Sequence, residues 1–122
     1  MKFEICIDVD DVVRAVDFYG RGLGFEVVES HPDWAQLKLN EQTFWVMKTA
    51  AGQEGAISRD FRRHWTPLHL DLQVDDLDEA VKRALKAGGK LDREIQRGPK
   101  SNLANLSDPS GNGIDLVERQ NK

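Results

Sequence analysis

Side chains that could do chemistry stand at every second position in two short stretches of the sequence. They are Glu4, Cys6 and Asp8 in the first stretch, and His69, Asp71 and Gln73 in the second. Carboxylates gathered beside a histidine repel one another unless a metal ion, an arginine or protonation of one carboxylate compensates their charge. The same pattern is also that of an ordinary solvated strand face, where most carboxylates lie. The residue types alone leave both interpretations open.

The residues between these side chains are apolar, which predicts two strands with one apolar face each. Ile5, Ile7 and Val9 alternate with the first set, and Leu70, Leu72 and Val74 with the second. A helix is predicted after each strand, because apolar residues then recur at helical spacing in 12–23 and 77–85. Asp76 with Glu79 predicts the start of the second helix. Gly24 and Gly88 with Gly89 mark the helix ends.

The two strand-helix pairs belong to an internal repeat. Val9-Asp10-Asp11-Val12 recurs as Val74-Asp75-Asp76-Leu77, 65 positions later, from 9 to 74. Two copies are too few to stack as a solenoid, so we expect a pseudo-symmetric pair of modules. Short extended segments separated by turn residues follow each helix; they are 25–29, 34–39 and 43–48, then 91–96, 103–107 and 114–118.

We therefore predict an α+β fold of two tandem β-α-β-β-β modules whose curved mixed sheets surround a cup. Residues 1–122 form one domain, with modules at 1–50 and 67–120 and a linker at 51–66. Because the apolar face of each sheet covers its helix, the opposite face must line the cup. The side chains expected on the lining are those of Glu4, Cys6, Asp8, His69, Asp71 and Gln73 in the opening strands, and of Thr43, Trp45, Met47, Asp115 and Val117 in the closing strands.

Composition excludes several classes of protein. The 122 residues carry a net charge of -4, which argues against a nucleic-acid partner, since such proteins usually present a basic face. The apolar runs are far shorter than a membrane span, and the first residues lack an apolar stretch of signal-peptide length. Cys6 is the single cysteine and forms no disulfide within the chain. We therefore expect no membrane partner and a cytoplasmic location.

Three motifs in order resemble the vicinal oxygen chelate superfamily, which includes glyoxalases, bleomycin resistance proteins, fosfomycin resistance enzymes and extradiol dioxygenases. The first motif is Ala15-Val16-Asp17-Phe18-Tyr19 with Leu23-Gly24-Phe25 after it. The second runs from His69 to Asp76. The third, and the most specific, is Asp108-Pro109-Ser110-Gly111-Asn112-Gly113-Ile114-Asp115-Leu116. The fold hosts isomerases, dioxygenases, transferases and metal-free binders, so function does not follow from it.

The resemblance implies a set of metal-ligand positions. Matched motif to motif, the ligands of the metal-dependent relatives fall on Glu4, Trp45, His69 and Asp115, of which Trp45 cannot bind a metal. The other three suit a divalent manganese, iron, zinc or nickel ion, as in relatives that use three ligands. Those relatives use two histidines and a glutamate, from which Glu4 and the shorter Asp115 depart. The resemblance also implies a homodimer whose cup is completed by modules of both subunits.

Two functions of different classes follow. In the first, a protein of the bleomycin resistance type binds a small organic molecule on Trp45 without a tightly held metal; the pocket residues would be Trp45, Asp71, Cys6, Met47 and Gln73. Alternatively, a metal-dependent lyase, isomerase or dioxygenase uses Glu4, His69 and Asp115, and the ion polarises substrate oxygens. Each residue also has a plainer interpretation: Trp45 and Cys6 as packing residues, His69 as a hydrogen-bonded strand residue.

The linker is rich in arginine and aromatic residues. Arg59, Arg62, Arg63 and Trp65 lie within a short segment of it. Such a segment is typical of a protein interface, and we expect it to contribute to a dimer contact. The alternative is an anion clamp, in which one arginine reaches over the cup and holds an anionic group of the ligand with two hydrogen bonds.

Overall fold

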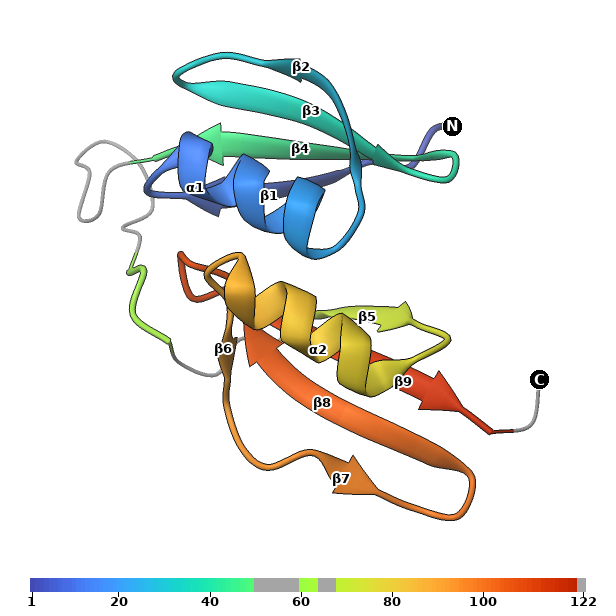
Figure 1. Ribbon diagram of the computed structural model, residues 1–122. Helices are drawn as coiled ribbons and strands as arrows, with labels where there is room; N and C mark the ends of the chain where they lie inside the picture. The colour runs from blue at the N-terminus through green and yellow to red at the C-terminus, as the bar shows by residue number, and fades with distance from the viewer. Residues whose placement is uncertain (50–59, 64–67, 121–122) are drawn as a thin grey trace.

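Two modules with the same plan follow each other along the chain (Figure 1). The computed structural model describes residues 1–49, 60–63 and 68–120. In the first module β1 is parallel to β4, and the strand order of its sheet is β1-β4-β3-β2. Its elements are β1 (Ile5–Val9), α1 (Val12–Asp17), a π-helical turn η1 (Phe18–Gly22), β2 (Glu26–Ser30), β3 (Trp34–Leu39) and β4 (Gln42–Lys48).

The second module repeats this order with one short strand more. Here β5 is parallel to β9, the strand order is β5-β9-β8-β6, and β7 also pairs with β8. The elements are β5 (Leu70–Gln73), α2 (Leu77–Lys86), β6 (Lys90–Leu91), β7 (Gln96–Arg97), β8 (Ser101–Ser107) and β9 (Gly113–Arg119). The structure thus confirms the predicted α+β fold of two β-α-β-β-β modules with mixed sheets. Within the described ranges, no helix has the length and apolar character that crossing a membrane would need.

Local sequence explains where the helices begin and how they meet. The side chains of Asp11 and Asp76 cap α1 and α2 by accepting hydrogen bonds from the backbone NH groups of Arg14 and Glu79. The first helix ends in the wider turn η1, which buries Phe18 and Tyr19 completely. A Cβ at Gly22 would lie 2.8 Å from the Cβ of Ala87. The missing side chain therefore lets η1 approach the end of α2 closely.

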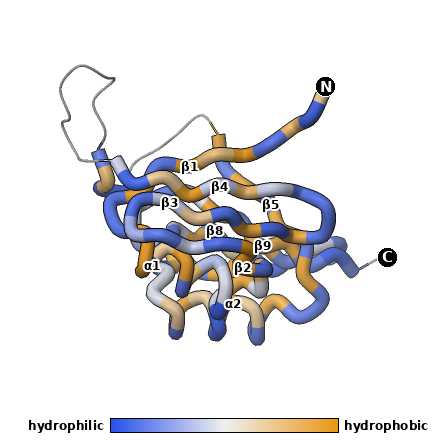
Figure 2. Tube along the Cα trace, turned by 90° about the horizontal axis from the view of Figure 1, so that it is seen from above, coloured by the Kyte–Doolittle hydropathy of each residue, from blue (hydrophilic) through white to orange (hydrophobic). Residues whose placement is uncertain are grey.

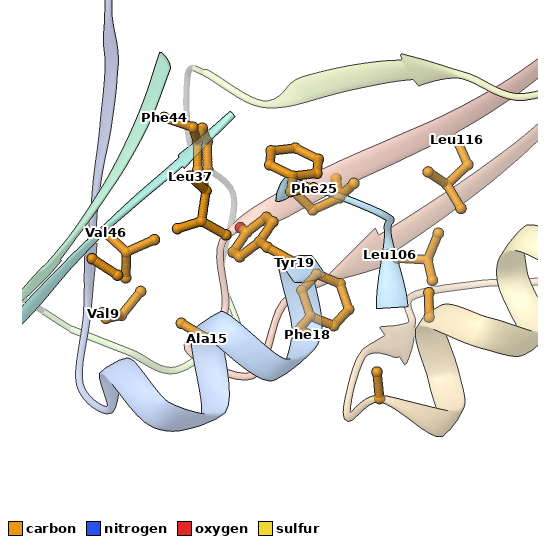
Figure 3. Packing of buried hydrophobic residues seen from close by; sticks show 14 of the residues in the cluster. Val9, Ala15, Phe18, Tyr19, Phe25, Leu37, Phe44, Val46, Leu106 and Leu116 are labelled. Atoms are coloured by element: carbon orange, nitrogen blue, oxygen red, sulfur yellow. The ribbon is translucent and has the colours of Figure 1, made fainter. Parts of the chain in front are cut away.

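Both modules share one hydrophobic core. The core faces of the sheets contribute Ala35, Leu37, Phe44 and Val46 from one module and Ala104, Leu106, Ile114 and Leu116 from the other. Figure 3 shows Tyr19 and Phe18 between the side chains of the two sheets, and in Figure 2 hydrophobic and hydrophilic stretches alternate along the tube. Because both apolar faces pack on this core, each sheet has an open face that points away from it. Within one chain, the described residues therefore leave the predicted cup without its second wall.

A buried carboxylate joins the two modules at the turn between β8 and β9. Asp108 is 2% exposed, and its Oδ2 accepts a hydrogen bond of 2.7 Å from the hydroxyl of Tyr19. Its Oδ1 accepts hydrogen bonds from the backbone NH groups of Ser110 and Asn112. The hydroxyl of Ser110 donates in turn to Asp10, which precedes α1. The most specific of the three sequence motifs therefore fastens the second module to the first.

The strand expected at 91–96 is divided into β6 and β7. Leu91 pairs with Leu106, and Gln96 pairs with Leu103. The chain advances five residues from Leu91 to Gln96, whereas β8 advances only three residues over the same distance. Two residues are in excess and cannot join the ladder. The backbone NH of Asp92 still donates to the carbonyl of Asn105 at 2.8 Å, and the chain then leaves the sheet before β7. This excursion brings Asp92 and Arg93 to the hollow that also contains Asn105 and Asp115.

Candidate binding faces of the two sheets

The open face of the first sheet is aromatic. Trp45 lies in the middle of β4, with Cys6 of β1 on one side and Gln36 of β3 on the other. In the next row, Met47 lies between Asp8 and Trp34. We call the surface formed by His31, Trp34, Trp45 and Met47 the aromatic face.

Three rings follow one another along this face. The ring centroids of Trp34 and Trp45 are 6.0 Å apart with an angle of 52° between the planes. The imidazole of His31 lies 4.3 Å from the ring of Trp34 at 35°. The side chains of both tryptophans are only partly buried, unlike those of the core aromatics. Because the ring planes are tilted, a planar molecule that stacks on one of these rings meets its neighbour at an angle.

Cys6 borders the aromatic face without the properties of a reactive thiol. Partial burial, and then the negative charge of Asp8, raise the pKa of this thiol above its ordinary value of 9.0. The nucleophilic form of cysteine is the thiolate, which is scarce at neutral pH when the pKa is raised. Cys6 is suited to contact a ligand rather than to attack one.

The open face of the second sheet carries ionisable side chains. The Nδ1 atom of His69 lies 2.9 Å from Oδ1 of Asp71 and 3.5 Å from Oδ2 of Asp115. Asp71 and Asp115 are paired directly across the parallel strands β5 and β9, and Gln73 follows beside Val117. The side chains of His69 and Asp71 are half-exposed, whereas that of Asp115 is mostly covered. We call His69, Asp71 and Asp115 the acidic triad.

A chain of hydrogen bonds holds the covered carboxylate of the triad. Arginine can only donate, so Arg93 Nε donates to Oδ1 of Asn105 at 2.7 Å. The amide of Asn105 must then present its Nδ2, which donates to Oδ1 of Asp115 at 2.8 Å. Oδ2 of Asp115 is thereby directed toward His69. A hollow of about 320 Å³ lies here, lined in part by Arg93, Asn105, Asp115 and His69.

The acidic triad has the types of ligand atom that a divalent-metal site needs. One ligand atom from each of its residues lies within 4.8 Å of the others, and an imidazole with two carboxylates suits a first-row ion. Among the described residues Glu4 does not belong to this group, and Asp71 takes its place. Of the metal ligands expected from the sequence, the structure thus brings His69 and Asp115 together and leaves Glu4 apart.

The registers of the two sheets test the alignment that placed Trp45 at a ligand position. Cys6 is opposite Trp45 in the first sheet, and Asp71 is opposite Asp115 in the second. Cys6 and Asp71 are equivalent positions of the internal repeat, from 6 to 71. Trp45 and Asp115 are therefore equivalent as well, and an indole stands where the other module has a carboxylate.

The arginines of the linker lie at different places. Arg62 pairs with Asp60, and its side chain is 89% exposed. Arg63 makes a two-point ion pair with Asp92 and lines the same 320 Å³ hollow as the acidic triad. Arg59 and Trp65 lie outside the described residues. Of the expected anion clamp or interface, the structure therefore places Arg63 beside the second open face.

A second hollow lies where the edge strands β1 and β5 approach each other. Its volume is about 370 Å³, and it is lined by Cys6 and Asp8 from the first module and by His69 from the second. Cys6 and Asp8 thus border both this hollow and the aromatic face. The opening strands of the two modules therefore do meet at one hollow, while Trp45 and Met47 lie farther along the first sheet.

The sequence-based prediction did not include His31 or Asn105 among the residues of these faces. His31 stands in a turn, where histidine, proline and aspartate indicated only a chain reversal, and its contact with Trp34 depends on the hairpin geometry. Asn105 stands at an open-face position of β8, and the alternation of apolar Ala104 and Leu106 around it could have indicated that orientation. Its partners Arg93 and Asp115 could not be read from the alternation.

Comparison with known proteins decides the family. The model of the family described as "Glyoxalase-like domain" matches residues 4–117. The chain belongs to the glyoxalase-like domain family. The glyoxalase-like domain is also similar to solved structures of the superfamily that its motifs resemble, which confirms that resemblance. It superposes on a glyoxalase/bleomycin resistance protein/dioxygenase family enzyme from Burkholderia phytofirmans with a TM-score of 0.75 and 21% identity, covering 95% of this chain and 96% of that one.

A fosfomycin resistance protein, FosX, from Listeria monocytogenes has a similar fold. The TM-score is 0.76 at 14% identity, and the match covers 100% of the glyoxalase-like domain and 93% of the other chain. Among curated proteins, the anthracycline biosynthesis protein DnrV of Streptomyces peucetius is 31% identical over 112 residues, 89% of this chain and 38% of the relative. DauV of Streptomyces sp. strain C5, of the same description, is 30% identical over 111 residues. The chain spans about two fifths of the length of these relatives.

Proposed function

We propose that this glyoxalase-like domain binds a planar aromatic small molecule on the aromatic face and does not need a tightly held metal to do so. The observation that carries this proposal is the pair of partly exposed indoles, Trp34 and Trp45, whose ring centroids are 6.0 Å apart on the open face. Covering an exposed indole with a ligand favours binding by about 25 cal/mol for each Å² of apolar area buried. Stacking adds about 0.5 to 1.5 kcal/mol for each aromatic pair.

The position of Trp45 in the sheet favours such a role. β4 is a central strand, hydrogen-bonded to β1 on one side and β3 on the other, so its backbone is fixed before a ligand arrives. Cys6 and Gln36 stand directly beside Trp45 on the neighbouring strands, and the ring centroid of Trp34 lies 6.0 Å from that of Trp45. A preorganised ring loses little conformational freedom on binding, which favours affinity.

The relatives support an aromatic ligand. DnrV and DauV are described as anthracycline biosynthesis proteins, and anthracyclines are fused-ring aromatic compounds. We propose that the ligand of the glyoxalase-like domain is likewise a planar organic molecule with more than one ring. The spacing of the ring centroids supports this size, because a single six-membered ring is too small to cover Trp34 and Trp45 together.

We further propose that a second copy of the chain completes the binding site. In one chain the open faces of both sheets point away from the shared core, so a ligand on the aromatic face stays covered on one side only. A homodimer would supply the second wall and complete the cup.

For the compartment we propose the reducing cytosol, which the single cysteine of the sequence supports.

The binding proposal is tested by calorimetric titration of the metal-free protein with proflavine, a planar tricyclic dye. We expect saturable binding by wild-type protein and a loss of about tenfold in affinity for Trp45→Ala, from lost ring contact and buried area. Val13→Ala serves as control, because Val13 is an exposed apolar residue on α1. Equal affinity of Trp45→Ala and wild type would overturn the proposal.

The acidic triad favours a second function, that of a metal-dependent lyase, isomerase or dioxygenase. His69, Asp71 and Asp115 would hold a divalent ion, which when bound would act as a Lewis acid on substrate oxygens. Asn105 would keep Asp115 oriented and accepting. Direct titration with Mn²⁺ tests this function: stoichiometric uptake that is lost in His69→Ala supports it, and no uptake at micromolar metal contradicts it.

A further inference from the structure

We propose that His31, held in place by Glu29, is the third ring of the ligand surface and that this pair makes the aromatic face selective for planar ligands with a positive charge. The inference rests on the proposed binding function and specifies the class of ligand that the face takes. The observations that carry it are the contacts of His31, the backbone irregularity that aims Glu29, and the charges of the face.

His31 is fixed by two contacts. Its ring lies 4.3 Å from that of Trp34, and its Nε2 lies 2.8 Å from Oε1 of Glu29. The backbone supports the same geometry, because the NH of His31 donates to the carbonyl of Trp34 at 2.8 Å and closes the turn between β2 and β3. The imidazole therefore extends the surface of Trp34, and 43% of the His31 side chain stays exposed to solvent.

A β-bulge places Glu29 on this face. Val27 pairs with Leu37, a core residue, and the register then shifts so that Glu29 pairs with Gln36. Without the shift, Glu29 would have the same orientation as Val27 and point toward the core side. An extra residue in a strand re-aims the side chains that follow it, and bulges often do so beside functional sites. Glu29 thereby reaches the ring that stacks on Trp34.

The charges on this face favour a cation. By the register of the sheet, the described side chains of the open face include the carboxylates of Asp8, Glu26 and Glu29 and the ammonium of Lys38. Acidic side chains therefore outnumber basic ones, and Glu29 and Asp8 stand on the outer strands, on either side of the rings. Indole faces also attract cations through the negative potential of the ring. A planar cation can stack on the rings and is also attracted by the carboxylates. A planar anion can stack on the rings but is repelled by the carboxylates.

The experiment compares two planar tricyclic probes of opposite charge, proflavine as the cation and anthraquinone-2-sulfonate as the anion. Both are titrated calorimetrically into wild type, His31→Ala, His31→Phe and Glu29→Gln. We expect wild type to prefer proflavine. His31→Ala should weaken both probes by about threefold to tenfold, and His31→Phe should restore the lost stacking. Glu29→Gln should weaken proflavine by about threefold and leave the anion unchanged or slightly tighter.

Controls separate this inference from the proposal on which it rests. Glu79→Gln removes a carboxylate from α2, away from the aromatic face, and should leave both affinities at wild-type values. If Trp45→Ala weakens proflavine binding by about tenfold while His31→Ala and Glu29→Gln bind both probes like wild type, the inference is wrong and the binding function stands. If Trp45→Ala binds proflavine like wild type, the binding function itself is wrong. Equal affinity of wild type for both probes overturns the charge selectivity.

Discussion

The two open faces of this domain are built on equivalent backbones and present different chemistry. In the first sheet the thiol of Cys6 lies opposite the indole of Trp45. At the equivalent position of the second sheet, two carboxylates lie opposite each other, those of Asp71 and Asp115. On the core faces the equivalent residues are apolar in both modules, for example Val46 and Leu116. Core positions must fill a close-packed interior, whereas an open-face side chain contributes little to folding.

This difference teaches that the repeat determines where a functional side chain stands but not what it does. The aromatic face offers ring surface and is suited to an organic ligand, and the acidic triad offers oxygen and nitrogen donors and is suited to a cation. The two functions proposed for the domain therefore belong to different faces. A substitution on one face should leave the chemistry of the other unchanged, whereas a substitution in the shared scaffold should affect both.

The largest effect is expected from Asp108→Ala, which removes the carboxylate that joins the modules. Tyr19, Ser110 and Asn112 would lose a buried acceptor. Several buried donors without a partner should lower the free energy of unfolding by about 3 kcal/mol or more. Thermal unfolding followed by circular dichroism measures the change, and binding of both proflavine and Mn²⁺ should fail at temperatures where wild type still binds. Asp78→Asn, at an exposed pair with Arg97, is the control. An unchanged melting temperature for Asp108→Ala would contradict this role.

The scaffold was largely predictable from the sequence because its signals are local. Alternation predicted β1 and β5, the 65-residue repeat predicted the second module, and the aspartate before each helix acts as its cap. The end of the first helix was less predictable. Residues 18–22 form a π-helical turn because Phe18 and Tyr19 must both reach the core, and that requirement comes from tertiary packing.

The site was predictable only where strand register determines it. His69 and Asp115 meet because β5 and β9 are parallel neighbours, as the motifs implied. Asp71 joins them through the same register, although it was expected only as a pocket residue. Glu29 depends on a bulge, and Arg93 depends on two residues in excess between β6 and β7. Neither irregularity leaves a periodic signal in the sequence.

Tyr19 provides a test of the scaffold at alkaline pH. Its pKa is raised well above 10.0 by burial, and then by the charge and the hydrogen bond of Asp108. The folded protein thus holds the phenol proton more tightly than the unfolded chain. The stabilisation is fully present below pH 10 and is lost as the pH rises toward the folded-state pKa.

We therefore expect tyrosinate absorbance to appear only together with unfolding. Tyr19 is the one tyrosine of the sequence, so the absorbance has a single source. Tyr19→Phe should be less stable at neutral pH by about 1 to 2 kcal/mol, because Asp108 loses a buried donor, and should depend less on alkaline pH. A tyrosinate signal with an ordinary midpoint in fully folded protein would contradict the buried contact.

Asn105→Ala should separate the two faces. The substitution removes the donor that holds Asp115 but leaves the aromatic face untouched. If the acidic triad binds a divalent ion, the affinity for Mn²⁺ should fall by about tenfold, the lower end of the range for residues that orient a ligand. Proflavine affinity should stay at the wild-type value. Arg97→Ala, on the neighbouring strand β7, is the control for both titrations. Wild-type Mn²⁺ affinity in Asn105→Ala, with binding lost in His69→Ala, would show that Asn105 does not position Asp115.

The smallest effect is expected at Cys6, which reports on the aromatic face from its border. Because burial and Asp8 raise the pKa of the thiol, reaction with Ellman's reagent at neutral pH should be slower than for free cysteine and should speed up as the pH rises. Asp8→Asn should speed it by about twofold to threefold, because one of the two causes of the shift is removed. Proflavine on the aromatic face should cover the thiol and slow the reaction, whereas Mn²⁺ at the acidic triad should leave the rate unchanged. Protection by Mn²⁺ instead of proflavine would mean that Cys6 belongs functionally to His69, across the hollow between β1 and β5, and that the two faces are one site.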